Sequence, residues 1–125
     1  MTGRKTLENL LWEAAKNALF CSKNEFCRSL DGWAIEPIEI GGELAFLTVK
    51  MGPKFHFHSL KTGHAMTRRM IVDFLRPIIA EFGYAETKTP HSDDRQHRFN
   101  HLIGFECVGE DAFDVIYRIY NVPGA

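Results

Sequence analysis

The chain has 125 residues, of which 45% are hydrophobic, 25% charged and 12% aromatic, which excludes an intrinsically disordered chain and predicts one domain with an apolar core. Fifteen Lys and Arg against sixteen Asp and Glu give a formal charge of −1, which favours neither nucleic acid nor a membrane as a general partner. No apolar run is long enough to span a bilayer, and Glu8, Glu13 and Lys16 interrupt any apolar segment of a signal peptide.

Cysteine usage bears on where the protein works. Cys21, Cys27 and Cys107 are an odd and sparse set, so the sequence predicts no disulfide framework and favours a reducing, cytoplasmic setting. No internal repeat, low-complexity segment or linker rich in Pro, Gly or Ser is visible. We therefore expect a single domain over 1–125, with a helical N-terminal part at 1–32 and a mixed sheet with two helices at 33–120.

Helical spacing dominates the N-terminal part. A helix is predicted over 6–20, because Thr6 can cap it and apolar residues then recur at every third or fourth position. A short second helix is predicted around Asn24–Leu30, where Asp31 and Gly32 end it.

The apolar period then changes to that of strands. Three strands are expected over 33–40, 44–51 and 55–58, with turns at Gly41-Gly42 and Gly52-Pro53. In the third strand Phe and His alternate, so the two Phe side chains share one face and His56 and His58 share the other.

The strongest periodic signal is an amphipathic helix over 66–82, with Pro77 predicted to kink it and Gly83 to end it. A strand over 85–89, a helix over 93–102 and a terminal strand pair over 105–108 and 112–120 follow. The step from strand 55–58 through the long helix to strand 85–89 implies a parallel pair with a right-handed crossover. The sequence therefore predicts an α/β fold, a mixed sheet with helices packed on it.

The segment between the third strand and the long helix has the features of an anion site. Free backbone N–H groups and the positive end of a helix dipole converge there, and Gly63 allows a close approach of the backbone. Lys61, Arg68 and Arg69 add positive charge. The alternative is an ordinary strand-to-helix turn.

Two segments resemble the GNAT superfamily, the Gcn-type N-acetyltransferases. In the family's phosphate loop, of form Q/R-x-x-G-x-G/A, Gly63 and Ala65 match the last two positions, while Leu60 stands where Gln or Arg is usual. Ile103-Gly104-Phe105 matches a Leu-Gly-Phe at the end of the family's last helix, and Asp93 lies where Asn often starts that helix. The resemblance covers about 33–120, and the family's first strand is missing.

The resemblance implies a GNAT-like acyl-CoA N-acyltransferase fold with a shortened N-terminal part. It implies acetyl-CoA as co-substrate, an amine acceptor of unidentified type and direct attack of the amine on the thioester. The residues that it implies for cofactor binding are Leu60, Lys61, Thr62, Gly63, His64, Ala65, Arg68, Arg69 and Asp93.

The resemblance identifies catalytic residues less completely than cofactor-binding residues. His56 and His58 lie on the strand expected beside the cofactor, and imidazole titrates near neutral pH, so either is a candidate base. Asn100 stands where the family has an acidic Tyr, and Asn cannot donate a proton in that way; Tyr117 on the last strand is a candidate substitute. The histidine pair has two other interpretations, a solvent-facing pair and a metal site, but the sequence has no metal-motif spacing and we predict no metal.

A rival hypothesis is that the protein has the GNAT fold but no catalytic activity. The stretch HRFNHLIGF is similar to short GNAT-like proteins of tailed bacteriophages. Leu60, Asn100 and the short N-terminal part favour a catalytically degenerate protein that acts as a phage structural, virion or interaction protein, with a virion or host protein as partner. Its location would be a bacterial or phage-infected cytoplasm, or the virion.

Overall fold

The computed structural model describes residues 3–16, 21–60 and 66–122. The chain divides into two compact units, the first comprising Met1–Met51 and His56–His64 and the second Gly52–Phe55 and Ala65–Ala125. None of the helices in the described ranges is both long and apolar enough to cross a membrane. The prediction of a single domain stays a prediction, and each unit is considered by itself.

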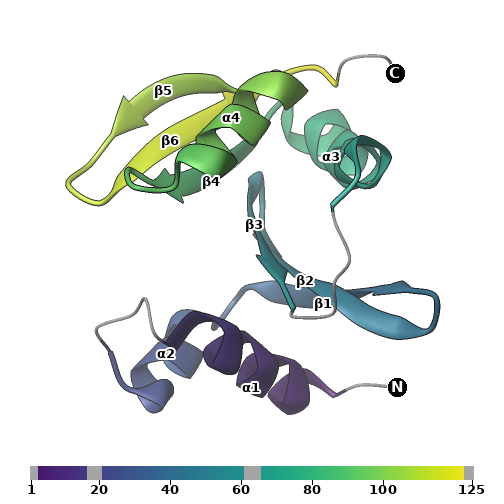
Figure 1. Ribbon diagram of the computed structural model, residues 1–125, viewed down its shortest axis with the longest axis vertical. Helices are drawn as coiled ribbons and strands as arrows, with labels where there is room; N and C mark the ends of the chain where they lie inside the picture. Colours follow the sequence, from purple (N-terminus) through teal and green to yellow (C-terminus); the bar gives the residue numbers. More distant parts are fainter. Residues whose placement is uncertain (1–2, 17–20, 61–65, 123–125) are drawn as a thin grey trace. The chain divides into compact units, whose positions relative to one another are not determined.

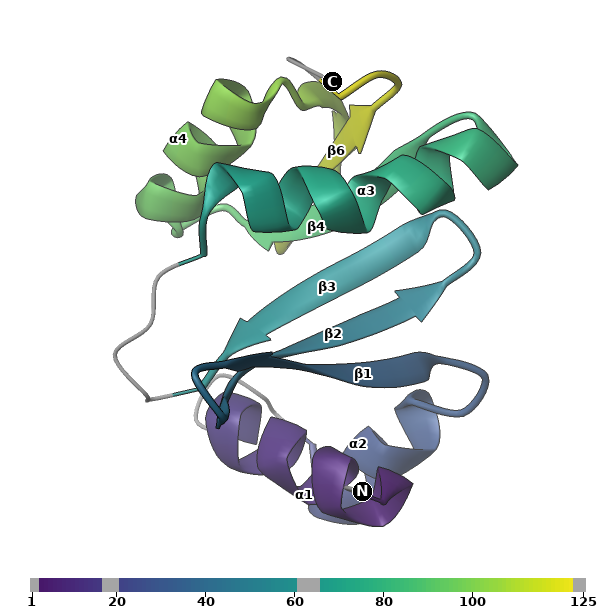
Figure 2. The same cartoon turned by 90° about the vertical axis from the view of Figure 1, so that its right-hand side faces the viewer.

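The first unit packs two helices on a β-hairpin. Helices α1 (Arg4–Ala15) and α2 (Lys23–Ser29) lie against strands β1 (Ala34–Ile40) and β2 (Glu43–Met51), as Figure 1 and Figure 2 show. The two strands pair antiparallel across the predicted Gly41-Gly42 turn, with an irregularity between Ile38 and Glu39. The buried core of this unit consists of Leu7, Leu11, Leu30, Leu47 and Val49.

The second unit contains the remaining helices, α3 (Arg68–Phe82) and α4 (Asp94–Ile103), and the strands β4 (Ala85–Pro90), β5 (Glu106–Glu110) and β6 (Asp114–Ile119). Strand β6 pairs antiparallel with both β4 and β5. Helix α3 buries Ile71, Val72, Leu75 and Ile78. Phe55 contacts Phe74 of α3 at 5.5 Å and Phe105 at 6.0 Å between ring centroids, so aromatic packing joins these segments.

Strand β3 (Lys54–Ser59) links the two sets of strands in the sheet order β1-β2-β3-β4-β6-β5. It pairs parallel with β4, where Lys54 is the register partner of Glu86 and the Glu86 amide donates to Pro53 O at 2.8 Å. The predicted parallel step across α3 is therefore confirmed, and so is the α/β fold class with a mixed sheet.

The starts of two helices differ from their predicted positions. Helix α1 begins at Arg4, and Gly3 occupies the N-cap that the sequence assigns to Thr6. The Arg4 guanidinium donates to the carbonyls of Trp33 and Leu30 at 2.7 and 2.8 Å, so tertiary contacts extend the helix toward its N-terminus. Helix α1 ends at Ala15, and 17–20 lie outside the described residues.

Helix α3 begins at Arg68 rather than Met66, because the Thr67 hydroxyl accepts a hydrogen bond from the Met70 amide and caps it. The helix continues through Pro77 and ends at the predicted Gly83, which adopts φ 85°. Only glycine adopts such a left-handed conformation at little cost.

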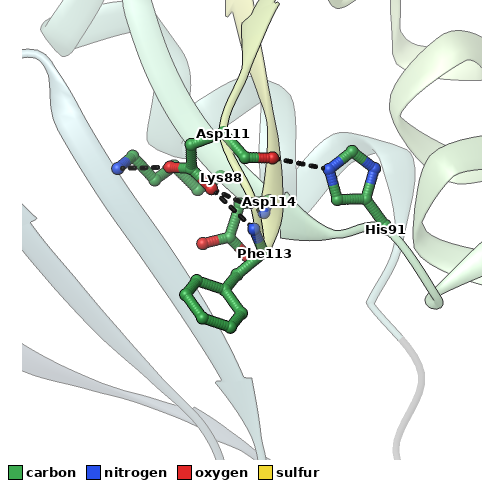
Figure 3. A network of polar contacts seen from close by, with 5 residues as sticks. All are labelled: Lys88, His91, Asp111, Phe113 and Asp114. Carbon is green, nitrogen blue, oxygen red and sulfur yellow. Dashed lines mark hydrogen bonds and ion pairs between the residues drawn. The ribbon is translucent and has the colours of Figure 1, made fainter.

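The turn between β5 and β6 explains why β6 begins later than predicted. Figure 3 shows the Asp111 carboxylate accepting hydrogen bonds from the amides of Phe113 and Asp114, at 2.9 and 2.8 Å. Lys88 Nζ lies 3.5 Å from the other carboxylate oxygen. His91 joins the same network, since its Nε2 lies 2.9 Å from Asp111 O and its amide donates to Phe113 O. The turn therefore ends at Asp114, and the loop before α4 is attached to it.

We expect Leu11→Ala to lower the free energy of unfolding by about 2–5 kcal/mol, because it leaves a cavity beneath α1. Leu11 is 0% exposed, whereas Leu102 is 78% exposed and Leu102→Ala is the matched control. The control is expected to change stability by less than about 0.5 kcal/mol. Urea unfolding of both variants measures the difference, and equal losses would contradict this assignment of the core.

Candidate functional site

The two candidate bases lie on one face of β3, as the alternation predicts. The imidazole of His56 faces the ring of Trp33, with centroids 5.6 Å apart and planes tilted by 33°. Burial, and then the neighbouring His56, lowers the pKa of His58 to about 4. His58 is therefore neutral at pH 7, with a lone pair able to accept a proton, but it is a weaker base than free imidazole.

The end of β3 leaves less of the predicted anion loop free than expected. The Leu60 amide donates to Ala45 O at 3.0 Å, and its side chain packs on the core of the first unit. That amide is already engaged by β2. The predicted loop residues Lys61, Thr62, Gly63, His64 and Ala65 lie outside the described residues.

The start of α3 carries the other part of the predicted anion site. The amides of Met70 and Ile71 are occupied by the hydroxyl and carbonyl oxygens of Thr67, each at 3.2 Å. No described residue accepts a hydrogen bond from the amides of Arg68 and Arg69, the first two of the helix. Both guanidinium groups are exposed, and Arg69 Nε lies 4.0 Å from the Asp73 carboxylate. Two amides and two cations therefore meet at the positive end of a helix dipole.

Asp93 has a local structural role at the start of α4. Its carboxylate accepts a hydrogen bond from the Gln96 amide at 3.2 Å and so caps the helix. This contact accounts for Asp93 without a cofactor, and its negative charge opposes the binding of a phosphate.

Asn100 attaches α4 to the sheet. Its side chain is 1% exposed; its Nδ2 donates to Thr89 Oγ1 at 2.9 Å, and its Oδ1 accepts from Gln96 Nε2 at 2.9 Å. A buried amide with both ends satisfied stabilises a packed helix. It supplies no titratable proton at the position that the sequence resemblance aligns with the acid of the GNAT family.

The hydroxyl of Tyr117 is also engaged. Tyr117 is 3% exposed, and its Oη lies 2.6 Å from His97 Nδ1, while His97 Nε2 lies 2.9 Å from Pro90 O. A carbonyl only accepts, so Nε2 carries the hydrogen, and in that tautomer Nδ1 accepts the proton of the Tyr117 hydroxyl. Burial, and then Cys107, raises the pKa of Tyr117. These contacts keep the proton within the second unit and disfavour a role as acid.

Sequence reasoning missed His97. His97 is half-buried against Tyr117, and His101 packs edge-on against the same ring at 5.7 Å. The signal was the spacing of His97, Asn100 and His101, which places all three on one face of α4. The structure thus brings Tyr117 into contact with His97 of α4, and it joins Asn100 of α4 to Thr89. His56 and His58 lie on one face of β3. Within the described residues, no group of three or more His, Cys, Asp or Glu side chains is arranged to hold a metal ion.

Comparison with known proteins identifies the fold. No protein-family model matches the chain, and no curated protein matches it in sequence. A Bacillus subtilis acetyltransferase in complex with CoA superposes with a TM-score of 0.68 at 15% identity, covering 98% of this chain and 95% of that one. The ribosomal-protein-alanine N-acetyltransferase of Brucella melitensis gives 0.65 at 11% identity, covering 94% and 93%. A GNAT family acetyltransferase from Elizabethkingia anophelis with acetyl-CoA bound gives 0.62 at 10%, covering 97% and 92%.

The protein therefore has the fold of the GNAT acetyltransferases, as the sequence resemblance predicted. The predicted resemblance to phage proteins finds no support in these comparisons.

We expect Tyr117→Phe to destabilise the protein by about 1–3 kcal/mol, because it removes the proton that His97 Nδ1 accepts in a buried site. Tyr84→Phe is the control, since the described residues offer no hydrogen-bond partner to the Tyr84 hydroxyl. Urea unfolding at pH 7.5 measures both variants. A Tyr117→Phe protein as stable as the control would contradict the hydrogen bond.

Proposed function

We propose that this protein is an acyl-CoA-dependent N-acetyltransferase that moves an acetyl group from acetyl-CoA to an amine. The observation that carries the proposal is the start of α3, where the amides of Arg68 and Arg69 and both guanidinium groups have the chemistry to bind a phosphate. The GNAT fold supports the same conclusion, since solved neighbours include acetyltransferases with CoA or acetyl-CoA bound.

The donor set fits a diphosphate better than a carboxylate. A helix N-terminus with free amides favours anions, and guanidinium groups form paired hydrogen bonds with phosphate oxygens. No acidic side chain lies in the first turn of α3. When bound, acetyl-CoA supplies an activated acyl group as a thioester; Arg68 and Arg69 would hold its phosphates.

The proton of the attacking amine passes to a histidine of β3 in this proposal. The amine nitrogen forms a bond to the acyl carbon, the carbon–sulfur bond breaks, and His58 or His56 takes the proton that the nitrogen loses. His58 is suited to accept a proton because it is neutral at pH 7, whereas its low pKa limits how strongly it draws the proton.

The leaving thiolate needs no protein acid in this scheme. Asn100 has no proton to give, and the hydroxyl of Tyr117 already donates to His97. A free thiol has a pKa of about 8.5, so a thiolate is a good leaving group and water can protonate it. The missing acid is expected to reduce the rate rather than abolish the reaction.

A second candidate function follows from Asn100. Asn100 in place of an acidic Tyr, buried and hydrogen-bonded to Thr89, also suits a protein that has kept the GNAT fold and lost catalysis. Such a protein would serve as a structural or interaction protein, in a virion in the phage version of the hypothesis. Binding of acetyl-CoA separates the two candidates.

We expect acetyl-CoA to stabilise the protein, by about 2.7 kcal/mol at a concentration one hundred times its Kd. Arg68→Glu should weaken this effect, because it places a negative charge beside the free amides of α3. Arg76→Glu, an exposed arginine further along the same helix, is the matched control. Thermal unfolding with and without the ligand gives the comparison. No stabilisation of the unaltered protein at millimolar acetyl-CoA would favour the non-catalytic candidate.

If His58 is the base, kcat/KM should fall only as the pH drops through about 4, since the base must be unprotonated and its pKa is about 4. Expressed per unprotonated amine, because primary amines of the lysine type titrate at about pH 10, kcat/KM should therefore be level between pH 5 and pH 8. His58→Ala is expected to lower kcat by about 10²–10⁴-fold, whereas His91→Ala, at the turn shown in Figure 3, should not. The assay follows release of the CoA thiol with a panel of primary amines.

Circular dichroism at each pH checks that the variants are folded. If His58→Ala retains its rate and His56→Ala does not, the base is His56. Unchanged rates in both variants would remove histidine from the mechanism.

A further inference from the structure

Helix α2 carries a polar stripe opposite the residues that pack on the core. Asn24, Cys27, Arg28 and Asp31 follow the spacing i, i+3, i+4 and i+7, which places them along one side of the helix and its C-terminal turn. Phe26 and Leu30 lie on the opposite side and pack on the core of the first unit. The polar stripe is therefore not the face that holds α2 in place.

This stripe borders a cavity that is largely open to solvent, and Asn24, Arg28 and Asp31 are exposed. Asn24, Cys27, Arg28 and Asp31, together with Glu8 of α1, line a space of about 380 Å³. Helices α1 and α2 run side by side in the same unit (Figure 2). Sites for small molecules commonly have volumes of about 300–1,000 Å³, so the cavity is large enough for a small organic ligand.

The walls of the cavity are held by contacts that do not use the stripe. Arg4 donates to the carbonyls of Leu30 and Trp33 at 2.8 and 2.7 Å and pairs with Glu8 Oε2 at 3.2 Å, which fixes the end of α2 against the start of α1. At its other end, α2 has a capping box between Ser22 and Glu25. These contacts hold the backbone of α2 in place beside the start of α1.

The polar groups around the cavity are largely free to bind a ligand. Toward residues 3–16, 21–60 and 66–122, the Arg28 side chain hydrogen-bonds only through Nε, which donates to Asn24 O at 3.4 Å. Glu8 pairs with Arg4 through one oxygen. Among the described residues, no side-chain hydrogen bond or ion pair engages the carboxylate of Asp31, and none joins Arg28 to Asp31 or to Glu8. One cation and one unpaired carboxylate thus line the same space without neutralising each other.

We propose that this cavity binds a small zwitterion of the α-amino-acid type. A ligand carboxylate would pair with the two free guanidinium nitrogens of Arg28, a geometry that favours paired hydrogen bonds. The ligand ammonium would pair with Asp31 and with the second oxygen of Glu8. A phosphate would meet two carboxylates, and a purely cationic ligand would meet Arg28, so neither matches the cavity as well as a zwitterion does.

The test is NMR titration of the ¹⁵N-labelled full-length chain with L-leucine, L-glutamate and L-lysine, each to 10 mM. We expect at least one of them to shift amide signals at Glu8 and over 24–31. The N-acetyl derivative of that amino acid lacks the ammonium and its carboxamide lacks the carboxylate, so each should bind at least tenfold more weakly. A lack of shifts with all three, or equal binding of the blocked derivatives, would overturn the proposal.

Variants test the two charged partners separately. Arg28→Gln and Asp31→Asn should each weaken binding at least tenfold, and Arg28→Lys should fall between Arg28→Gln and the unaltered protein, because it keeps the charge but loses the paired geometry. Glu13→Gln, on α1 but outside the cavity, should bind normally. Thermal unfolding confirms that each variant is folded. Because the NMR titration contains no acetyl-CoA, its result does not depend on whether the protein has the proposed transferase activity.

Discussion

The parallel pairing of β3 with β4 is the constraint on which the arrangement of the candidate site depends. The Glu86 amide donates to Pro53 O and Lys54 is the register partner of Glu86, so the two strands run in the same direction. Parallel neighbours require a crossover, and α3 supplies it. In open α/β sheets ligands bind at the carboxyl ends of the parallel strands, near the starts of the helices that follow them, and α3 is the helix that follows β3 in the chain. Thr67 engages the amides of Met70 and Ile71, which leaves the first two amides of α3 without an acceptor among the described residues.

Helix α4 illustrates how the same scaffold can keep its form while its chemistry changes. Its inner face is polar: Asn100 donates to Thr89, and His97 bridges Tyr117 and Pro90. The Asn100 contact is buried and the Tyr117 contact half-buried, whereas the contact of His97 with Pro90 is exposed. Pairing of the buried polar groups is what such a helix needs to pack on a sheet. The same contacts use up the groups that an acid catalyst would need. The structural role of Asn100 and Tyr117 thus explains why the best-supported chemistry relies on β3 and α3 instead.

The sequence predicted the fold where a local signal decides the structure. The apolar period of α3, the glycine turn at Gly41-Gly42 and the alternation of β3 depend on neighbours in sequence, and all three are found. It failed where a distant partner decides. Helix α1 starts at Arg4 because Arg4 reaches Leu30 and Trp33, and the role of His97 was missed because its partner Tyr117 is 20 residues away. The lowered pKa of His58 is of the same kind, since burial cannot be inferred from an alternating pattern alone.

The polar stripe of α2 raises the question of when such a stripe marks a site and when it is only a solvated face. On an ordinary surface helix the polar residues face water over a convex surface, and their charges pair along the helix or remain hydrated. Here the stripe faces Glu8 across a cavity, and Arg28 and Asp31 lie in the same space without forming an ion pair. Arg4 donates to the Leu30 carbonyl and pairs with Glu8, which ties the end of α2 to the start of α1 beside this space. A hollow on the surface and two charges of opposite sign that do not pair with each other are each common on proteins. Their coincidence at one place is the argument for a binding site rather than a hydrated face.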